Sequence, residues 1–310
     1  MRAAGIREFG GPVAIIDLPD PRELADDEVM IEVRAAGVAG WDEIVRAGDW
    51  DVGRTPPMAL GVAAAGVITA VGKGVEEWKP GDEVLTHPLP LRDQGAWAPS
   101  MIAPAELLAI KPDAVAWDAA AAFPVPALTA AQAIDETLGV TADDLVLVHG
   151  GGGVTGTVLV SLAVARGAEV VATAGPANHE RLHRLGASTL LDYHDAGWPE
   201  QARALRDGSG VSAAVVAAPD GGADLIRTVR DGGRLATITS ETPSEERGIA
   251  VTSLIVRPDG PQLGEMVDLL AAGKLDIAVA STFGLAEAAA ALAAAEDGHG
   301  GAVVLRPMSI

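Results

Sequence analysis

The sequence predicts an α/β protein with two domains, one rich in β-strands and one built on a doubly wound parallel sheet. The chain has 310 residues, which is enough for two domains that each bury a core of their own. Short apolar runs separated by turn residues fill the first 123 positions, and strands alternate with helices from about residue 143. This change of rhythm predicts the fold class.

The first region has the pattern of short strands. Each expected strand is an apolar or β-branched run bounded by Gly, Pro or Asp, as strands between tight turns usually are. These runs are residues 13–18, 28–33, 66–71, 83–87 and 107–110.

The second region alternates strands with helices, which implies right-handed βαβ units and a parallel sheet covered on both faces. The expected strands are 145–148, 169–174, 189–193, 213–218 and 234–239, and the expected helices are 154–166, 179–185, 199–206 and 224–229. Beyond them the sequence predicts a strand at 249–256, helices at 262–272 and 285–296, and a last strand at 302–305. We expect this tail to return to the first domain.

Composition excludes several kinds of partner and chemistry. Forty-three acidic residues against 22 basic ones give a net charge of −21, which repels nucleic acid and anionic membrane surfaces. A small molecule is therefore the expected partner. The chain has no cysteine, which removes disulfides, thiolate nucleophiles, Fe–S ligation and every zinc site that contains Cys.

Targeting and membrane signals are not apparent in the sequence. The residues after Met1 lack the apolar stretch of a signal peptide. The alanine-rich segments 119–122 and 286–295 are bounded or interrupted by prolines and glutamates, so neither has the length of a bilayer span. We expect a cytoplasmic protein without a membrane span.

A glycine-rich loop follows the buried run 145–148. Gly151, Gly153 and Gly156 form a Gly-x-Gly-x-x-Gly pattern that includes Val154 and Thr155. Because the loop joins a strand to a helix, its N–H groups and the positive end of the helix can face a pyrophosphate. The alternative is a tight turn in a glycine-rich chain.

The choice of dinucleotide follows from the next strand. NAD-binding versions of this loop usually have an acid at the end of the second strand, which binds the ribose 2′-hydroxyl. Here that strand ends in Thr173, Ala174 and Gly175, and Glu169 lies at its beginning. Asn178 and Arg181 come next, and a guanidinium can hold a 2′-phosphate. We expect NADP(H), with an exposed helix charge as the alternative role of Arg181.

With the loop in place, the whole chain resembles the zinc-independent, quinone oxidoreductase-like branch of the medium-chain dehydrogenase/reductase superfamily. The matching stretches are Ala35 to Val38 with Asp42 and Arg46 to Gly48, Gly66 to Val84, Phe123 to Ala130, the glycine loop, and Leu185 to Tyr193. The resemblance implies a GroES-like substrate domain from residues 1–123 and 262–310. It also implies a Rossmann domain from residues 124–261, with the active site in the cleft between the two.

The resemblance also implies further cofactor contacts. Thr129 matches a family threonine near the nicotinamide, with helix capping as its alternative role. Tyr193, the only tyrosine, matches a residue at the adenosine phosphate end. Ala217 and Ala218 follow the fourth strand and are expected beside the nicotinamide ribose. The family's Gly-Lys pair before the last strand is replaced by Gly301 and Ala302, which removes one phosphate contact.

The residues that resemble the family's catalytic positions have lost their polar groups. Ala39 stands where zinc-dependent members have their first ligand, and the glutamate expected near Gly61 to Ala64 is missing. We therefore predict no metal site. Members of the zinc-independent branch often carry an Asn and a Tyr near the nicotinamide, but the matching positions here are Ala39 and Ile44.

The catalytic residues stay unknown at this point. Trp41, Asp42, Trp50 and Trp97 are the candidates on the substrate side, because a tryptophan can stack on a planar acceptor. The alternative for the tryptophans is core packing, and Asp42 can equally hold a loop by hydrogen bonds.

These observations favour an NADPH-dependent oxidoreductase that transfers hydride to a quinone or an α,β-unsaturated carbonyl. Without a metal Lewis acid, conjugation in the acceptor must spread the developing charge. Two alternatives stay open: a non-catalytic, dinucleotide-binding redox sensor or interaction protein, and a carbonyl reductase or tailoring enzyme with the same cofactor. The family often dimerises through its last Rossmann strand, so we expect a homodimer formed through residues 249–256.

Overall fold

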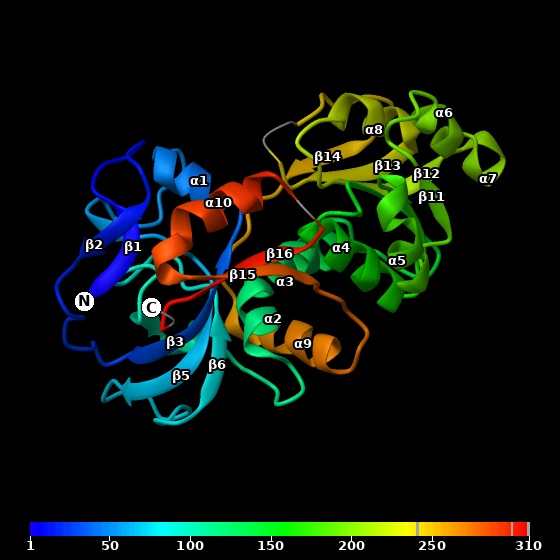
Figure 1. Ribbon diagram of the computed structural model, residues 1–310. Coiled ribbons are helices and arrows are strands. Elements are labelled where there is room, and N and C mark those ends of the chain that lie inside the picture. The colour runs from blue at the N-terminus through cyan, green and yellow to red at the C-terminus, as the bar shows by residue number, and fades with distance from the viewer. Residues whose placement is uncertain (240–241, 299, 309–310) are drawn as a thin grey trace. The chain divides into compact units, whose positions relative to one another are not determined.

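The computed structural model describes residues 1–239, 242–298 and 300–308 (Figure 1). Its chain forms two compact units. Unit 1 comprises Met1–Val125, Arg257–Ala271 and Ile277–Ile310, and unit 2 comprises Pro126–Val256 and Ala272–Asp276. Compared with the predicted domains, residues 124–125 and 257–261 fall in unit 1 and residues 272–276 fall in unit 2.

Unit 1 is built from mostly antiparallel strands around the long strand β3 (Glu28–Val38), and of its described strands only β15 and β16 pair in parallel. A small sheet has the order β2-β1-β4, and a seven-stranded sheet has the order β15-β16-β3-β5-β6-β8, with β7 also paired to β3. The remaining strands are β1 (Arg2–Ile6), β2 (Ala14–Asp17), β4 (Met58–Ala59), β5 (Ala64–Val71), β6 (Glu83–Thr86), β7 (Ser100–Pro104), β8 (Leu108–Ile110), β15 (Val279–Gly284) and β16 (Ala302–Arg306). Val304 of β16 pairs with Gly37 of β3, so the C-terminal strand lies within the sheet of the N-terminal region.

Short helices accompany these sheets. They are α1 (Gly40–Ala47), α2 (Trp117–Ala122), α9 (Gly260–Ala271) and α10 (Ala288–Glu296), with single 3₁₀ turns at Ala105–Leu107 and Leu285–Glu287. The first turn of α1 is fixed by Asp42, whose Oδ2 accepts the N–H of Ala39 at 2.9 Å. The helix ends at Gly48 in a left-handed conformation, which favours glycine.

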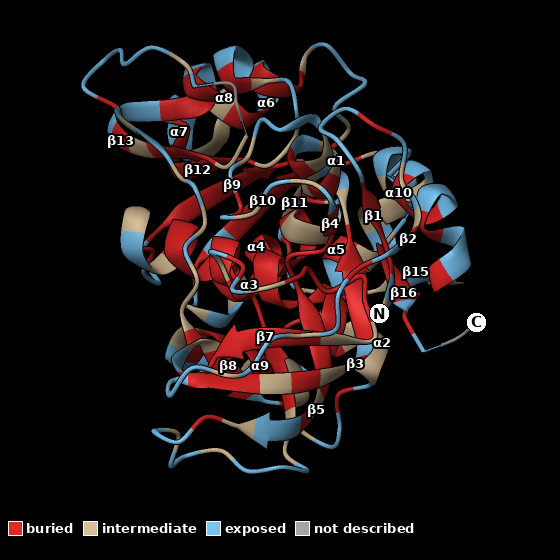
Figure 2. Cartoon of the chain, turned by 90° about the vertical axis from the view of Figure 1, so that its left-hand side faces the viewer, coloured by how far each residue is buried: buried red, intermediate tan, exposed pale blue. Residues whose placement is uncertain are grey.

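Unit 2 is a six-stranded parallel sheet in the order β11-β10-β9-β12-β13-β14. Its strands are β9 (Leu145–His149), β10 (Glu169–Thr173), β11 (Thr189–Leu191), β12 (Val211–Val216), β13 (Val229–Thr237) and β14 (Ala250–Ser253). The central strands β9 and β12 are buried at every residue (Figure 2). Continuous apolar runs of this kind are what a parallel sheet covered on both faces requires.

Helices lie between the strands of unit 2, as a doubly wound fold requires. They are α4 (Val154–Ala165), α5 (His179–Arg184), α6 (Trp198–Arg203), α7 (Leu205–Gly208) and α8 (Gly222–Thr228), with a 3₁₀ turn at Pro176–Asn178. Ahead of β9, α3 (Pro124–Ala131) runs on into a π-helix at Gln132–Thr137. Within the described residues, no helix has both the length and the apolar character needed to cross a bilayer.

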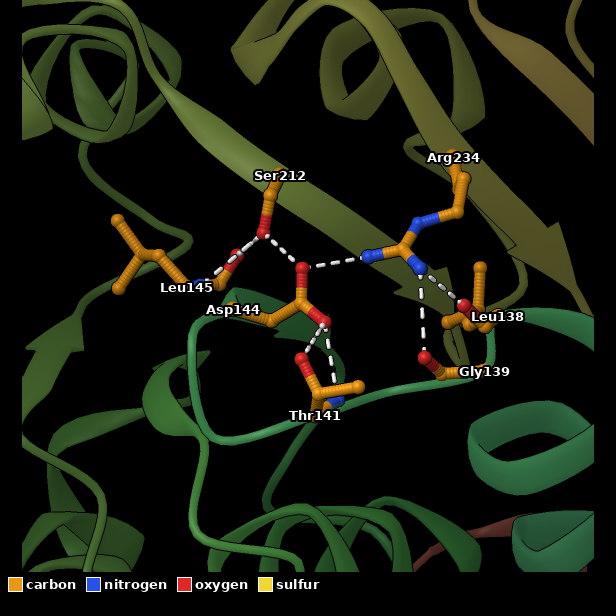
Figure 3. A network of polar contacts seen from close by, with 7 residues as sticks. All are labelled: Leu138, Gly139, Thr141, Asp144, Leu145, Ser212 and Arg234. Atoms are coloured by element: carbon orange, nitrogen blue, oxygen red, sulfur yellow. Dashed lines mark hydrogen bonds and ion pairs between the residues drawn. The ribbon is translucent and has the colours of Figure 1, made fainter.

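A polar network fixes the amino ends of the central strands (Figure 3). Asp144 accepts hydrogen bonds from Ser212 at the start of β12 (2.7 Å) and from the backbone of Thr141 (2.9 Å), and it pairs with Arg234 of β13. Burial opposes ionisation of Asp144, but the bonds from Ser212 and Thr141 and the charge of Arg234 outweigh it and lower its pKa. The network joins β9, β12 and β13 at the edge opposite the glycine loop.

Candidate functional site

The glycine loop lies at the carboxyl end of β9 and is bonded to the end of β10. The N–H of Gly150 donates to Thr173 Oγ1 at 3.1 Å, and the N–H of Gly151 donates to the Thr173 carbonyl at 2.9 Å. Gly153 closes the turn with a 3.1 Å bond to the Gly150 carbonyl. Helix α4 then begins at Val154, and its first N–H groups have no partner within the helix.

The glycines of the loop have different reasons for lacking a side chain. A Cβ on Gly156 would lie 2.0 Å from the Gly150 carbonyl oxygen, so the helix packs against the turn with no room for a methyl group. A Cβ on Gly153 would meet nothing closer than 3.5 Å. The protein itself therefore requires Gly156, whereas Gly153 leaves open the space that an approaching pyrophosphate needs. These features fit a dinucleotide.

Several other predicted cofactor residues lie around this loop. Asn178 is next to Gly152, where an added Cβ would be 2.7 Å from Nδ2, and Ala217 and Ala218 are next to Gly150 at 3.0 Å. The half-exposed ring of Tyr193 lies beside Gly175, within 3.8 Å of the Cβ position. The ends of β10, β11 and β12 thus gather these residues at one edge of unit 2. Their role in cofactor binding stays a prediction.

Arg181 is not free for a phosphate. Its Nε and Nη2 atoms both donate to Oδ2 of Asp276, at 2.9 and 2.8 Å, and its side chain is only 20% exposed. The sequence analysis missed this partner because Asp276 is 95 residues away. Glu169 lies at the amino end of β10 and pairs with Arg206 at 2.8 Å, so it is at the wrong end of the strand for the ribose.

Thr129 lies in the sixth position of α3. The expectation that it starts a helix is wrong, and with it the capping alternative, because the helix already begins at Pro124. Proline is well tolerated at the first helical positions, where its missing N–H has no partner to lose. Thr129 is buried. Its contact with the nicotinamide stays a prediction.

Two of the substrate-side candidates of unit 1, Trp97 and Asp42, lie next to Gly61. Trp97 is fully buried, and its Nε1 donates to the Gly37 carbonyl at 3.1 Å. A Cβ on Gly61 would lie 2.3 Å from this ring. The contacts of Trp97 therefore fit the packing alternative. Trp41 and Trp50 are half-buried and keep part of their rings accessible.

Two buried titratable groups flank the same segment. Asp42 is fully buried, and among the described residues its Oδ1 has no hydrogen-bond partner. Burial raises its pKa to about 7, although the backbone N–H groups of Ala39 and Gly61 act in the opposite direction. Asp42 therefore holds the start of α1, and its protonated and ionised forms have similar free energies near neutral pH.

His87 is the second of these groups, and it is buried, with 1% exposure. Its Nδ1 donates to the Val62 carbonyl at 2.7 Å, and its ring centroid is 6.4 Å from that of Trp50. Burial lowers its pKa to about 4, which the bond to Val62 only partly offsets. The ring is therefore neutral, and Nε2 is a buried acceptor without a partner in the described chain.

A surface hollow of about 390 Å³ adjoins Trp50 in the sequence. Asp51, Gly53, Arg54 and Thr55 line it, and Nε of Arg54 is buried without a partner in the described chain. The 50–54 segment is tied to the 87–91 segment by the bond from Leu91 N–H to the Val52 carbonyl, at 2.8 Å. The sequence contains no pattern that would have pointed to this pairing.

The residues present do not fit a catalytic zinc. Zinc is held in proteins by Cys, His, Asp and Glu in sets of three or four. The chain has no cysteine, and in the described residues no three such side chains come together. Ala39 has no ligand atom in its side chain, and Asp42 points its Oδ2 to its own helix end.

The N-terminal and the C-terminal parts of this chain each match a family of known proteins. Residues 25–113 match the model of the alcohol dehydrogenase GroES-like domain, and residues 185–305 match that of the zinc-binding dehydrogenase domain. Erythronolide synthase EryA2 of Saccharopolyspora erythraea is 34% identical over 94% of the chain, which spans 8% of that synthase. The quinone oxidoreductase of Sus scrofa is 26% identical over 79% of this chain and 75% of its own.

Solved structures extend the similarity to the full length. The crystal structure of an NAD-dependent alcohol dehydrogenase has a TM-score of 0.90 at 29% identity and covers 99% of this chain and 100% of its own. Mycobacterial Rv1454c complexed with NADPH has a TM-score of 0.87 at 28% identity, with the same coverage. The predicted fold class is thereby confirmed. The chain belongs to the medium-chain dehydrogenase/reductase superfamily of oxidoreductases and is quinone oxidoreductase-like.

Proposed function

We propose that this protein is an NADPH-dependent, zinc-independent reductase of quinones or α,β-unsaturated carbonyls. The observation that carries the proposal is a complete dinucleotide loop in a chain whose described residues contain no ligand set for the family's zinc. In the family's zinc-dependent members, that Lewis acid stabilises the charge on the oxygen of a ketone or alcohol substrate. A conjugated acceptor spreads the charge over its own atoms.

The residues of unit 2 fit the binding of the cofactor, which supplies a hydride from its nicotinamide when bound. The N–H groups at the start of α4 and the open side of Gly153 would hold the pyrophosphate. Ala217 and Ala218 would border the nicotinamide ribose, and their small side chains leave room for it. Tyr193 and Asn178 would lie at the adenosine end.

The preference for NADP(H) rests on the end of β10. Thr173, Ala174 and Gly175 offer no carboxylate there to bind a 2′-hydroxyl or repel a 2′-phosphate. The hydroxyl of Tyr193 and the amide of Asn178 are neutral donors near this end. Arg181 would contribute only by exchanging Asp276 for the phosphate, so we expect its share to be small.

The substrate side would rely on shape and stacking. Trp41 and Trp50 offer flat apolar faces for a planar acceptor. Asp42 and His87 are too buried to touch a substrate, and Ala39 and Ile44 carry no polar group. The proton that completes the reduction would then come from water or from a ribose hydroxyl.

A second candidate is the reduction of an enoyl group as a tailoring step. The similarity to erythronolide synthase EryA2 over 94% of the chain favours it. The chemistry is the same hydride transfer to a conjugated carbonyl, and only the acceptor differs.

One assay tests both candidates. Purified protein is treated with a chelator, and NADPH oxidation is followed with a quinone, an enone, an enoyl thioester, an aldehyde and a saturated ketone, each repeated with NADH. We expect turnover with conjugated acceptors only, and faster with NADPH. Binding of NADPH without oxidation by any acceptor would favour the redox sensor instead, and tighter binding of NADH would overturn the cofactor assignment.

We also propose a homodimer formed through β14. This strand is last in the sheet order of the described chain, and Ile255 just beyond it is 82% exposed. An apolar strand at a sheet edge is a ready pairing surface. Light scattering should give twice the chain mass for the wild type and the single mass for Ile255→Asp, and a monomeric wild type would refute the dimer.

A further inference from the structure

His149 is the last residue of β9 and lies directly before the glycine loop. It is buried, and both of its ring nitrogens are engaged. Nδ1 lies 2.8 Å from Thr173 Oγ1 at the end of β10. Nε2 lies 3.0 Å from the carbonyl oxygen of Asp220, in the loop after β12. One imidazole thus joins the carboxyl ends of three neighbouring strands.

The carbonyl of Asp220 fixes the direction of one hydrogen bond, and the direction of the other follows for a neutral ring. The Asp220 carbonyl can only accept, so Nε2 carries a proton and donates it. Thr173 Oγ1 accepts the N–H of Gly150 at 3.1 Å. In the neutral ring Nδ1 is an acceptor, so the Thr173 hydroxyl donates to it. The result is a chain that runs from Gly150 N–H through the Thr173 hydroxyl to His149, and from His149 to Asp220.

Packing holds the ring in this orientation. His149 is stacked on Trp198, with ring centroids 5.0 Å apart and an interplanar angle of 15°. On the other side, Gly221 has a φ of +111°, and a Cβ there would lie 2.3 Å from Nε2. A side chain at position 221 is therefore excluded both by the backbone conformation and by the imidazole.

We propose that His149 is a positioning residue that aligns the pyrophosphate loop with the segment that borders the nicotinamide ribose. The loop side is held through Thr173 and Gly150, and the ribose side is held through Asp220, which follows Ala217, Ala218 and Pro219. The inference rests on the proposed function, because the residues that it aligns are the predicted cofactor contacts. It adds a residue that keeps the two segments of predicted cofactor contacts in register through hydrogen bonds within the protein.

Substitutions of Thr173 test the loop side. Thr173→Val keeps the shape but leaves Gly150 N–H and His149 Nδ1 without partners, so the Kd for NADPH should rise by about tenfold or more. Thr173→Ser keeps the hydroxyl and should stay within about threefold of the wild type. The kcat at saturating NADPH should change little in either variant, because the bond to Asp220 is intact.

His149→Phe tests both sides together. It keeps the stack on Trp198 and removes both hydrogen bonds, so it should raise the Kd and also lower kcat. If His149 aligns two segments, Thr173→Val should change only the Kd. His149→Phe should change both the Kd and kcat. If Thr173→Val weakened NADPH binding only through lost packing, Thr173→Ser would not keep the wild-type affinity.

The tautomer gives a readout that needs no cofactor. Nitrogen-15 NMR of histidine-labelled wild-type protein should show His149 neutral, protonated at Nε2, with a hydrogen-bonded Nδ1. Protonation at Nδ1 would overturn the inference, as would Thr173→Val binding NADPH as tightly as the wild type. A wild type that binds NADPH but reduces nothing refutes only the proposed reductase. A wild type that binds no dinucleotide refutes the cofactor site and, with it, this role of His149.

Discussion

The carboxyl edge of the unit 2 sheet and the Gly61–Val62 region of unit 1 treat their buried polar groups differently. At the sheet edge, His149, Thr173 and Gly150 satisfy one another through bonds of 2.8 to 3.1 Å. In unit 1, the side chains of Asp42, Arg54 and His87 each keep one buried polar atom without a partner among the described residues.

From this difference we infer which of the two regions is built to bind a single ligand. A buried polar atom left unpaired costs about 1–3 kcal/mol, so a region that pairs all of them is rigid and holds one geometry. The carboxyl edge of the unit 2 sheet is such a region, which agrees with the dinucleotide site that we propose there. Unit 1 retains the electrostatic cost of these unpaired atoms, and we propose that the identity of the acceptor is accordingly less determined there.

The largest expected effect comes from adding a side chain at Gly156, at the carboxyl edge of the unit 2 sheet. Gly156→Ala places a methyl group about 2 Å from the Gly150 carbonyl oxygen, so α4 must separate from the loop. We expect the Kd for NADPH to rise about a hundredfold or more. Fluorescence titration of bound NADPH measures the change.

Gly153→Ala is the matched control, because its Cβ meets no atom of the protein within 3.5 Å. This variant should keep the wild-type thermal stability and lose affinity only because the methyl group obstructs the phosphates. Equal melting temperatures and equal affinities for the two variants would contradict the distinct roles assigned to these glycines.

The next effect concerns the buried carboxyl of unit 1. The folded pKa of Asp42, about 7, is above its ordinary value of 3.8, so the folded state binds the extra proton between these limits. The free energy of unfolding should therefore fall by up to about 4 kcal/mol as pH rises from about 4 to 7. Above pH 7 it should stay at this lower value. Asp42→Asn should remove this loss. Urea unfolding at pH 4, 5.5 and 8 measures it.

His87 should act with the opposite sign. Its folded pKa, about 4, is below its ordinary value of 6.5, so the unfolded state binds more protons between them. Stability should fall as pH drops from 6.5 to 4, by up to about 3 kcal/mol. His87→Asn, whose amide can still donate to Val62, should remove this slope. A pH dependence that is identical in wild type, Asp42→Asn and His87→Asn would refute both assignments.

The smallest expected effect concerns Arg181 in unit 2. Because Asp276 already occupies its guanidinium, Arg181→Gln should raise the Kd for NADPH by less than about tenfold and leave that for NADH unchanged. Parallel titrations with both cofactors test this. A loss of NADPH affinity above a hundredfold would mean that the arginine leaves Asp276 for the phosphate.

Local patterns predicted much of unit 2 because its elements are long, apolar and regularly spaced. The glycine loop was placed correctly between β9 and α4 for this reason. Strand β1 and helix α1 were missed because their pairing and packing depend on distant residues. The partner of Arg181 and the burial of His87 are likewise set by contacts across the fold, which no local spacing encodes.

The central claim is hydride transfer from this chain's dinucleotide site to a conjugated acceptor without a metal. It is tested most directly with NADPH deuterated at C4 of the nicotinamide, chelator-treated protein and an enone, by locating the label in the product by NMR. The account predicts one deuterium on the β-carbon, formed about a hundredfold more slowly at subsaturating NADPH when Gly156→Ala replaces the wild type. Oxidation that leaves no label in the product, or transfer that stops when the chelator is added, would contradict it.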